Sequence, residues 1–251
     1  MNALLYSLAA VVIVAILLFI FEKVIFSKIK DTITNDEVSN FLNFIGVLFT
    51  LILAFVVVAA WEDYDNAMHT AQDEAHKLLY IHEDAADLSP ANKKIFQDKL
   101  EDYTNSIIKD EWDNMDENHK VKVTEDKFHE LITLKKTFVV NGDQDIINEV
   151  DDGLDELKVL RHARESYTES HVPSLLWFVL FGGYTICILL CFCVEFEKLA
   201  WKTLMVSLVT FTMSVVLYLT YSLSNPYKGD MKITSEHYVK SLEKMKSNNK
   251  Y

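Results

Sequence analysis

The chain has 251 residues, half of them hydrophobic, and 37 acidic against 24 basic residues give a formal net charge of −13. With 3 Pro and 6 Gly, the composition excludes a flexible linker, a collagen-like repeat and a low-complexity tract. The acidic balance excludes nucleic acid as a partner, and the 3 cysteines, Cys187, Cys191 and Cys193, lie within one apolar stretch, which excludes a disulfide framework.

Four apolar stretches are long enough to cross a lipid bilayer. About 20 residues cross a hydrocarbon core of roughly 30 Å, and residues 4–21, 38–61, 173–194 and 201–223 meet this length without an ionisable side chain in their interior. Each is predicted to be a transmembrane helix, because backbone groups in lipid must bond within their own segment. The first stretch could instead be a signal peptide, but no Lys or Arg precedes it and no small-residue cleavage site follows it, so we expect a retained span.

The segment between the second and third spans carries almost all of the net charge. Residues 62–165 contain 27 acidic and 13 basic residues, whereas the rest of the chain has 10 acidic and 11 basic residues. Apolar residues still recur at helical spacing, which predicts a folded helical domain rather than a disordered one. The second span has no helix breaker before Ala67, and a further helix pair is predicted at 124–140 and 145–167, separated at Asn141-Gly142. The apolar positions are Leu78, Ile81, Ala85, Leu88, Ile95, Phe96, Leu100, Tyr103 and Ile107.

The sequence therefore predicts an all-α membrane protein with four transmembrane helices and an acidic helical domain between helices 2 and 3. The predicted boundaries are 1–61 for the first two spans, 62–172 for the acidic domain, 173–224 for the last two spans and 225–251 for a C-terminal tail. Four spans place both termini and the acidic domain on one side of the membrane. Basic residues flank both sides in similar number, so the positive-inside rule does not choose the orientation.

The second span carries the most informative pattern. One face of this span carries small and mildly polar groups, whereas its other faces are bulky and apolar. The small, mildly polar face is unfavourable toward lipid, so it either lines a water-filled path or packs against another helix. This predicted pore-lining face shares one side of a helix because its members recur at spacings of three and four. Its members are Asn40, Asn43, Val47, Thr50 and Ala54.

Small residues suited to helix packing occur in two spans. Gly46 forms a small-residue series with Thr50 and Ala54, which allows close helix contact. The fourth span repeats the theme with Ser207, Thr210 and Ser214. We expect these residues to support packing, although hydroxyl groups can instead bond to carbonyls of their own helix.

The sequence contains no recognisable catalytic or cofactor motif: there is no Gly-rich phosphate loop, zinc-protease motif, nucleophile elbow or dinucleotide fingerprint. We therefore expect neither enzymatic activity nor a cofactor. Asp65, His69 and Asp73 follow the second span at successive helical turns and offer oxygen and nitrogen ligands to a divalent ion. The simpler interpretation is a solvated helix face with side-chain pairs.

Three stretches carry a resemblance: GVLFTLILAFVVVAAWEDYDNAMHTAQDEA at 46–75, RHARESYTESHVPSLLWFVLFGG at 161–183 and SNPYKGDMKIT at 224–234. Together they resemble the bestrophin-like domain family, four-span proteins of bacteria and plants that are similar to the bestrophin channels. The resemblance covers the spans and their flanks and leaves the central domain largely unmatched. It implies a homo-oligomer, a pentamer in bestrophins, with cytosolic termini and a central pore that the second span lines. Asn225-Pro226-Tyr227 looks like the start of the bestrophin calcium clasp. Residues 228–232, KGDMK, follow it in place of the acidic run of that clasp, so the resemblance does not imply calcium gating here.

The leading hypothesis is a homo-oligomeric ion channel in a bacterial plasma membrane, with the lipid bilayer, further copies of the chain and inorganic ions as its partners. Glu62, Asp63 and Asp65 would form a vestibule that concentrates cations by focusing negative potential. The alternative is a non-conducting membrane scaffold or sensor. An enzyme acting on lipid is the least supported class.

Overall fold

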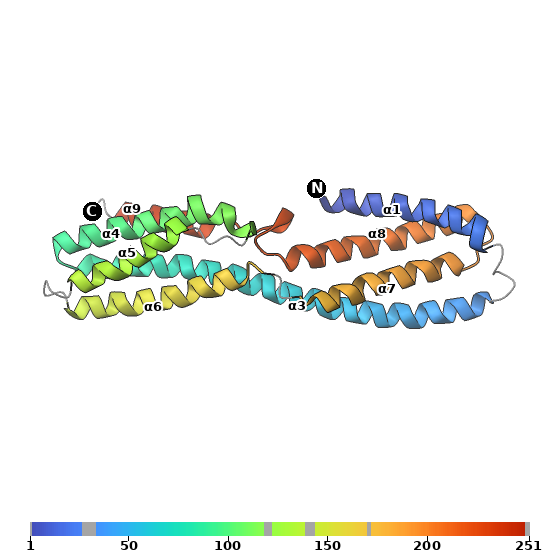
Figure 1. Cartoon of the computed structure of the whole chain (residues 1–251), viewed down its shortest axis with the longest axis horizontal. Helices are drawn as coiled ribbons and strands as arrows, with labels where there is room; N and C mark the ends of the chain where they lie inside the picture. Colours follow the sequence, from blue (N-terminus) through green and yellow to red (C-terminus); the bar gives the residue numbers. More distant parts are fainter. Residues whose placement is uncertain (1, 27–33, 118–121, 139–143, 170–171, 249–251) are drawn as a thin grey trace. The chain divides into compact units, whose positions relative to one another are not determined.

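The computed structural model describes residues 2–26, 34–117, 122–138, 144–169 and 172–248 (Figure 1). The predicted helix break at Asn141-Gly142 lies outside these residues. The chain divides into two compact units. We call residues 1–63 with 170–224 the membrane unit, and residues 64–169 with 225–251 the acidic unit.

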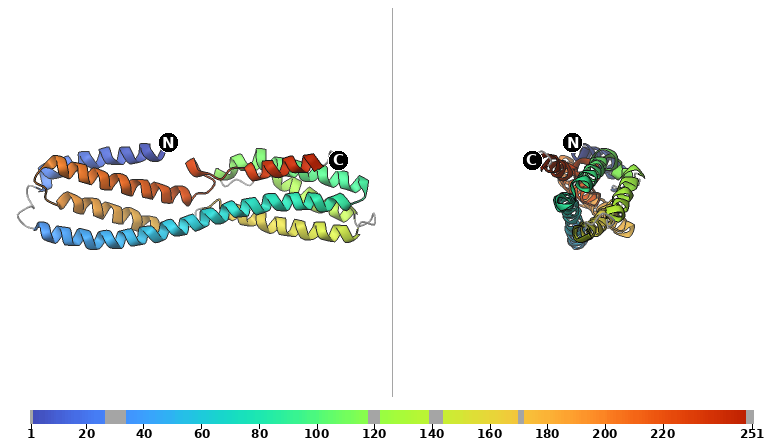
Figure 2. Two further views of the ribbon diagram at one scale, coloured as in Figure 1. Left: turned by 180° about the vertical axis from the view of Figure 1, so that it is seen from behind. Right: turned by 90° about the vertical axis from the view of Figure 1, so that its left-hand side faces the viewer.

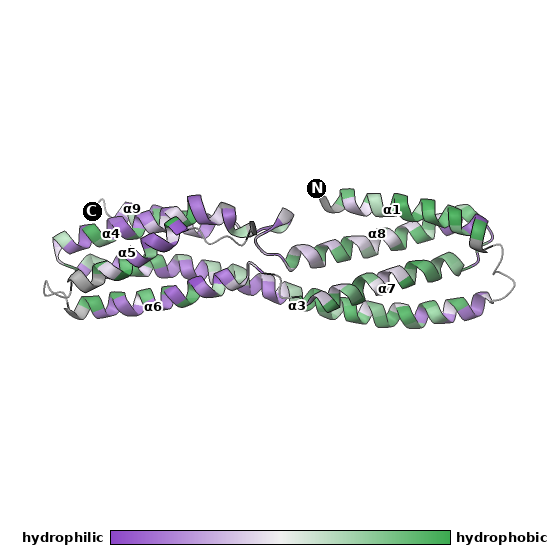
Figure 3. Cartoon of the chain, in the orientation of Figure 1, coloured by the Kyte–Doolittle hydropathy of each residue, from purple (hydrophilic) through white to green (hydrophobic). Residues whose placement is uncertain are grey.

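The membrane unit consists of four helices that are long and apolar enough to cross a bilayer. Hydrophobic residues dominate α1 and α7 and much of α8 (Figure 3). The predicted all-α fold with four spans is thus confirmed. The helices are α1 (Asn2–Phe21) with the π-helical turn η1 (Glu22–Phe26), the first part of α3 (Asn35–Asp84), α7 (Ser174–Cys193) and α8 (Leu199–Leu223).

The core of the membrane unit forms where α8 packs against both α1 and α7. Its buried side chains are Val14, Leu18, Ile188, Phe192 and Val206. Most other apolar side chains of these helices stay exposed, as expected for helices that complete their burial in lipid.

Helix α3 approaches α7 at a glycine. A Cβ atom on Gly183 would lie 2.4 Å from Cδ2 of Phe49, so the ring occupies the space that any larger residue needs. The start of α3 is fixed by a capping box, in which the Thr34 amide donates to Oε2 of Glu37 at 3.0 Å and the Glu37 amide donates to Oγ1 of Thr34 at 3.3 Å. The Glu195 amide donates to the Asn35 side chain at 2.9 Å, which ties this start to the α7–α8 connection.

The acidic unit is also built from helices. Helix α3 continues from the membrane span to Asp84, as its lack of a breaker predicted. Helix α4 packs against α5 and α9, and α5 packs against α6; both sides of the molecule show α9 running beside α4 (Figure 2). The further elements are η2 (Ala85–Asp87), α4 (Pro90–Ser106), η3 (Ile107–Glu111), η4 (Trp112–Glu117), α5 (Lys122–Phe138), α6 (Gln144–Ser166), η6 (Gly229–Met231) and α9 (Glu236–Asn248).

The core of the acidic unit begins on a small-residue face of α3. Ala67, Ala71 and Ala75 recur every four residues and are fully buried, which lets neighbouring helices approach closely. The predicted apolar positions Leu78, Ile81, Leu100 and Tyr103 lie in this core, together with residues of α5, α6 and α9. The helical spacing read from the sequence is therefore the spacing of the buried face, except at Ile95, which is 46% exposed.

Residues 225–251 were predicted only as a C-terminal tail. The structure places α9 there, with Tyr238, Leu242 and Met245 buried against the acidic unit. The segment before α9 is held by two long-range bonds: Tyr64 donates to the carbonyl of Met231 at 2.9 Å, and Nε1 of Trp112 donates to the carbonyl of Ile233 at 3.2 Å.

Candidate functional site

The residues predicted to line a pore lie on the face of α3 that the membrane unit leaves uncovered. The opposite face packs inward, with Phe49, Val56 and Ala60 at most 6% exposed. Single-chain packing therefore leaves the predicted face available to lipid, water or another molecule. All five of its members, Asn40, Asn43, Val47, Thr50 and Ala54, are exposed.

Thr50 differs in its hydrogen bonding from the other threonines of the spans that are exposed or half-buried. Thr185, Thr203 and Thr212 each donate to the carbonyl four residues earlier, at 2.8, 3.0 and 3.0 Å, which satisfies the hydroxyl within its own helix. The Thr50 hydroxyl has no hydrogen-bond partner among the described residues, although it lies near the middle of the apolar stretch 38–61. The same holds for the side-chain amide of Asn43. This face thus presents unsatisfied polar groups where lipid offers no partner.

A groove of about 590 Å³ borders this face within the membrane unit. Its α3 wall includes Asn43, Gly46 and Thr50, and its other walls come from α7 and α8. A Cβ atom on Gly46 would meet no atom within 4 Å, so the single chain does not use the small size of this residue. The remaining lining residues are Leu42, Val47, Leu51, Ala54, Cys187, Cys191, Val209 and Met213.

The hydroxyl residues that were singled out on α8 lie at different depths. Ser214 contacts α7, because its Oγ lies 3.2 Å from the hydroxyl of Tyr184. Thr210 is fully buried, and its Oγ1 has no hydrogen-bond partner within the described part of the chain. Ser207 is half-buried. Of the three, Ser214 has a side-chain bond between helices.

The acidic residues that follow the second span show no clustered arrangement. Glu62 is exposed, and Asp63 and Asp65 are half-buried. Nε2 of His69 lies 3.6 Å from Oδ2 of Asp65 one helical turn away, with 60% and 43% of the two side chains accessible to solvent, and Asp73 is exposed. Over the described ranges, no group of three or more His, Cys, Asp or Glu side chains is arranged to hold a metal ion.

A buried ionic network, which sequence reasoning missed, lies at the centre of the acidic unit. Arg164 of α6 is fully buried and donates from Nε to Oε2 of Glu74 at 2.5 Å and from Nη2 to Oε1 of Glu111 at 2.8 Å. Tyr238 of α9 donates its hydroxyl to Oε2 of Glu74 at 2.8 Å. The network therefore joins α3, η3, α6 and α9.

The surroundings of this network fix the protonation of its members. Burial alone lowers the pKa of the Arg164 guanidinium, but the carboxylates of Glu74 and Glu111 outweigh it and raise the pKa well above its ordinary value. Burial, followed by the nearby Glu74 carboxylate, raises the pKa of Tyr238 well above its ordinary value. Arg164 therefore stays charged and Tyr238 stays a hydrogen-bond donor at physiological pH. The only signal in the sequence was the arginine pair in the 161–183 stretch, whose partners lie 53 and 90 residues away.

Fold and site together define a helical membrane protein with four spans, an uncovered polar face on the second span and a separate acidic helical unit. Residues 8–238 match the Bestrophin-like domain, and the chain belongs to this family. The family that the three stretches indicated is therefore confirmed.

Solved structures share the fold over almost the whole chain. A bacterial bestrophin homologue from Klebsiella pneumoniae gives a TM-score of 0.69 at 13% sequence identity and covers 96% of each chain. A point variant of a bestrophin homologue from the same organism gives 0.72 at 12% identity and covers 98% of each chain. No curated protein sequence matches the chain. At these identities the likeness establishes the common fold.

Proposed function

We propose that this protein is a homo-oligomeric ion channel whose pore is lined by α3. The observation that carries this proposal is Thr50, an exposed hydroxyl residue near the middle of the apolar stretch 38–61 without a hydrogen-bond partner among the described residues. Lipid cannot satisfy this group, whereas water in a pore can. Membership of the bestrophin-like family supports the same function.

The size of the chain and its uncovered surface support the oligomer that we propose. A pore inside one four-helix chain would be too narrow for ions, so a conduction path belongs on a symmetry axis between copies. Gly46 supports this, because its lack of a side chain leaves open space in the single chain that a neighbouring helix can enter. Similarity to bestrophins makes five copies the subunit number that we propose.

We further propose that the channel favours cations. Glu62, Asp63 and Asp65 follow the pore-lining span directly and would form a negatively charged vestibule at its end. A vestibule of one sign raises the local concentration of counter-ions. We place the protein in a bacterial plasma membrane with the acidic unit and both termini in the cytosol, and we assign it no enzymatic activity.

Ion flux into liposomes tests this function. Wild-type protein reconstituted with a potassium gradient should conduct potassium faster than chloride, and Thr50→Leu should change the flux because leucine is larger and cannot contact water through a hydroxyl group. Thr185→Leu is the matched control, since Thr185 is also exposed in a span but donates to the carbonyl of Phe181. Vesicles that stay tight to cations and anions alike, although the protein is oligomeric, would refute the channel.

A non-conducting membrane scaffold or sensor is the second candidate. It is favoured by the series Gly46, Thr50 and Ala54, which suits close helix packing as well as it suits a pore. In a scaffold, Thr50→Leu would weaken assembly of the oligomer and leave the ion permeability of vesicles at the background level.

A further inference from the structure

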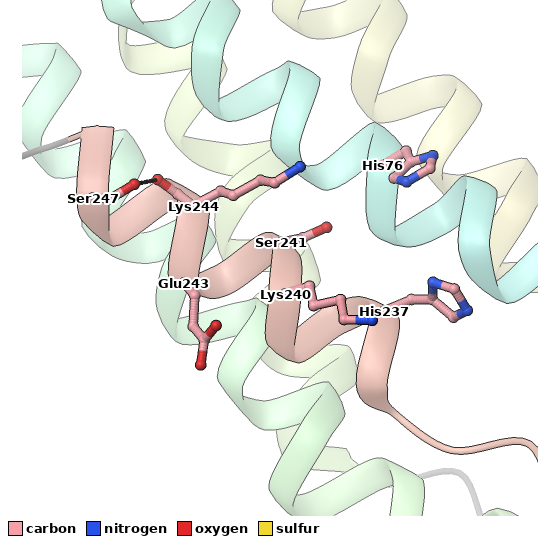
Figure 4. A pocket seen from close by; sticks show the side chains of 7 residues that line it. All are labelled: His76, His237, Lys240, Ser241, Glu243, Lys244 and Ser247. Carbon is pink, nitrogen blue, oxygen red and sulfur yellow. Dashed lines mark hydrogen bonds between the residues drawn. The ribbon is translucent and has the colours of Figure 1, made fainter.

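A pocket of about 350 Å³ lies between α3 and α9 in the acidic unit (Figure 4). Helix α3 contributes one side chain to its wall, and α9 contributes the others. The pocket is lined by His76, His237, Lys240, Ser241, Glu243, Lys244 and Ser247. Its lining differs from that of the proposed pore, because all of its side chains are polar or charged.

Ser241 of α9 places a hydroxyl group in the wall of this pocket. The residue is 3% exposed, yet its hydroxyl has no hydrogen-bond partner among the residues that the structure describes. Figure 4 shows the hydroxyl pointing from α9 toward the side where His76 and His237 lie. By contrast, Ser247 at the pocket edge donates to the carbonyl of Lys244 at 2.8 Å. Because this hydroxyl lines the pocket and is not sealed in the core, it is free to donate to a ligand bound there.

The pocket also concentrates positive charge in an otherwise acidic unit. Residues 64–169 contain 26 acidic and 13 basic residues, but the amine of Lys244 extends toward α3 and has no ion-pair partner in the described ranges. Lys240 pairs with Glu236 at 2.6 Å, but both side chains are more than 60% exposed, so this pair competes weakly with a ligand. The carboxylate of Glu243 points away from the histidines in Figure 4.

The lining groups select the chemistry of the ligand. Two ammonium groups, a hydroxyl and two imidazoles supply hydrogen-bond donors, which suit an anion with several acceptor oxygens. A metal ion fits poorly, because the ammonium groups repel cations. We propose that the pocket between α3 and α9 binds an oxyanion of the phosphate class, either free or as the phosphoryl group of a larger molecule.

This binding would join two elements of the acidic unit. His76 lies on α3, whereas Ser241 and Lys244 lie on α9, so one bound anion contacts both helices. Ligand that binds only when α9 is docked stabilises the docked state by mass action. The proposal does not depend on ion conduction.

Calorimetric titration of the full-length protein in detergent tests the site, with inorganic phosphate and glycerol phosphate as separate probes in phosphate-free buffer. We expect saturable binding of at least one probe. Lys244→Gln should weaken it by about tenfold or more, because one charge-assisted bond is lost, and Ser241→Ala should weaken it by about threefold to tenfold. Lys246→Gln is the matched control, since Lys246 is exposed on the same helix but does not line the pocket.

The two probes distinguish the source of the ligand. Tighter binding of inorganic phosphate supports a free anion, and tighter binding of glycerol phosphate supports a phosphorylated molecule. No saturable heat with either probe up to about 10 mM, which is weaker than any specific site of this size should be, would overturn the proposal. An equal loss in Lys246→Gln and Lys244→Gln would also overturn it, and Ser241→Ala decides the matter if the Lys244 variant fails to fold by circular dichroism.

Discussion

Replacing Arg164 with methionine removes the centre of the ionic network in the acidic unit. The guanidinium makes three hydrogen bonds to two carboxylates, from Nε and Nη2 to Glu74 at 2.5 and 3.3 Å and from Nη2 to Glu111 at 2.8 Å. Arg164 and Glu74 are both fully buried, and Glu111 is 5% exposed. The variant therefore leaves the buried Glu74 carboxylate without its cation, whereas Glu111 keeps the buried Arg161, whose Nη2 lies 3.8 Å from its Oε2.

The expected cost follows from this burial. Breaking a buried ion pair by removing one partner destabilises a protein by about 3–5 kcal/mol, because the remaining charge is uncompensated. For a unit of this size such a loss lowers the midpoint of thermal unfolding by roughly 10 °C or more. Arg164→Lys should be destabilising as well, since an ammonium group cannot bridge both carboxylates with the planar geometry of a guanidinium.

The assay is thermal unfolding of the detergent-purified protein, followed by circular dichroism and by limited proteolysis of the acidic unit. The matched control is Lys99→Met, which breaks an ion pair of 2.7 Å to Glu130 whose side chains are 40% and 48% exposed. This control should leave the midpoint nearly unchanged, because water solvates the remaining charge. Equal midpoints for the Arg164 and Lys99 variants would refute the assignment of Arg164 as the electrostatic centre of the unit.

Three further predictions use other parts of the structure. Gly183→Ala should lower stability by about 1–3 kcal/mol because its Cβ would lie 2.4 Å from the Phe49 ring, whereas Gly182→Ala, with no atom within 4 Å, should be tolerated; equal unfolding midpoints would contradict the α3–α7 contact. Burial, followed by the charge of a nearby lysine, lowers the pKa of His82 from 6.5 to about 4. The folded state therefore resists protonation of His82, so the stability that comes from neutral His82 is complete above about pH 6.5 and is lost as the pH falls toward 4. His82→Asn should flatten the dependence of the unfolding free energy on pH between pH 7 and pH 4. Parallel curves for the variant and the wild type would argue against this role of His82. Thr34→Ala should lower the stability of the α3 start by about 1 kcal/mol, because it removes the capping box. Protection of the first turn of α3 from hydrogen exchange should fall accordingly, and unchanged protection would contradict the role of the cap.

Much of the fold could be predicted because its signals are local. Uninterrupted apolar length marks each span, and the spacing of Leu78, Ile81 and Tyr103 marks the buried faces of the acidic unit. The family could also be identified from three short stretches. These features depend on residues that are close together in the sequence.

The parts that could not be predicted depend on contacts between distant residues. Glu74 receives hydrogen bonds from residues 90 and 164 positions away, and neither spacing carries a local signal. Helix α9 was missed for the same reason, because Tyr238 and Met245 become informative only once the surface that buries them is known. The pocket between α3 and α9 likewise requires both helices to be placed.

The most direct test of the central claim is single-particle imaging of the detergent-purified protein, with the density viewed along its symmetry axis. The proposed channel predicts a ring of copies around a continuous axial path, with the Thr50 side chains of successive copies facing that path. A monomer, or a closed dimer without an axial path, would contradict the channel and would make the acidic unit the place where function resides.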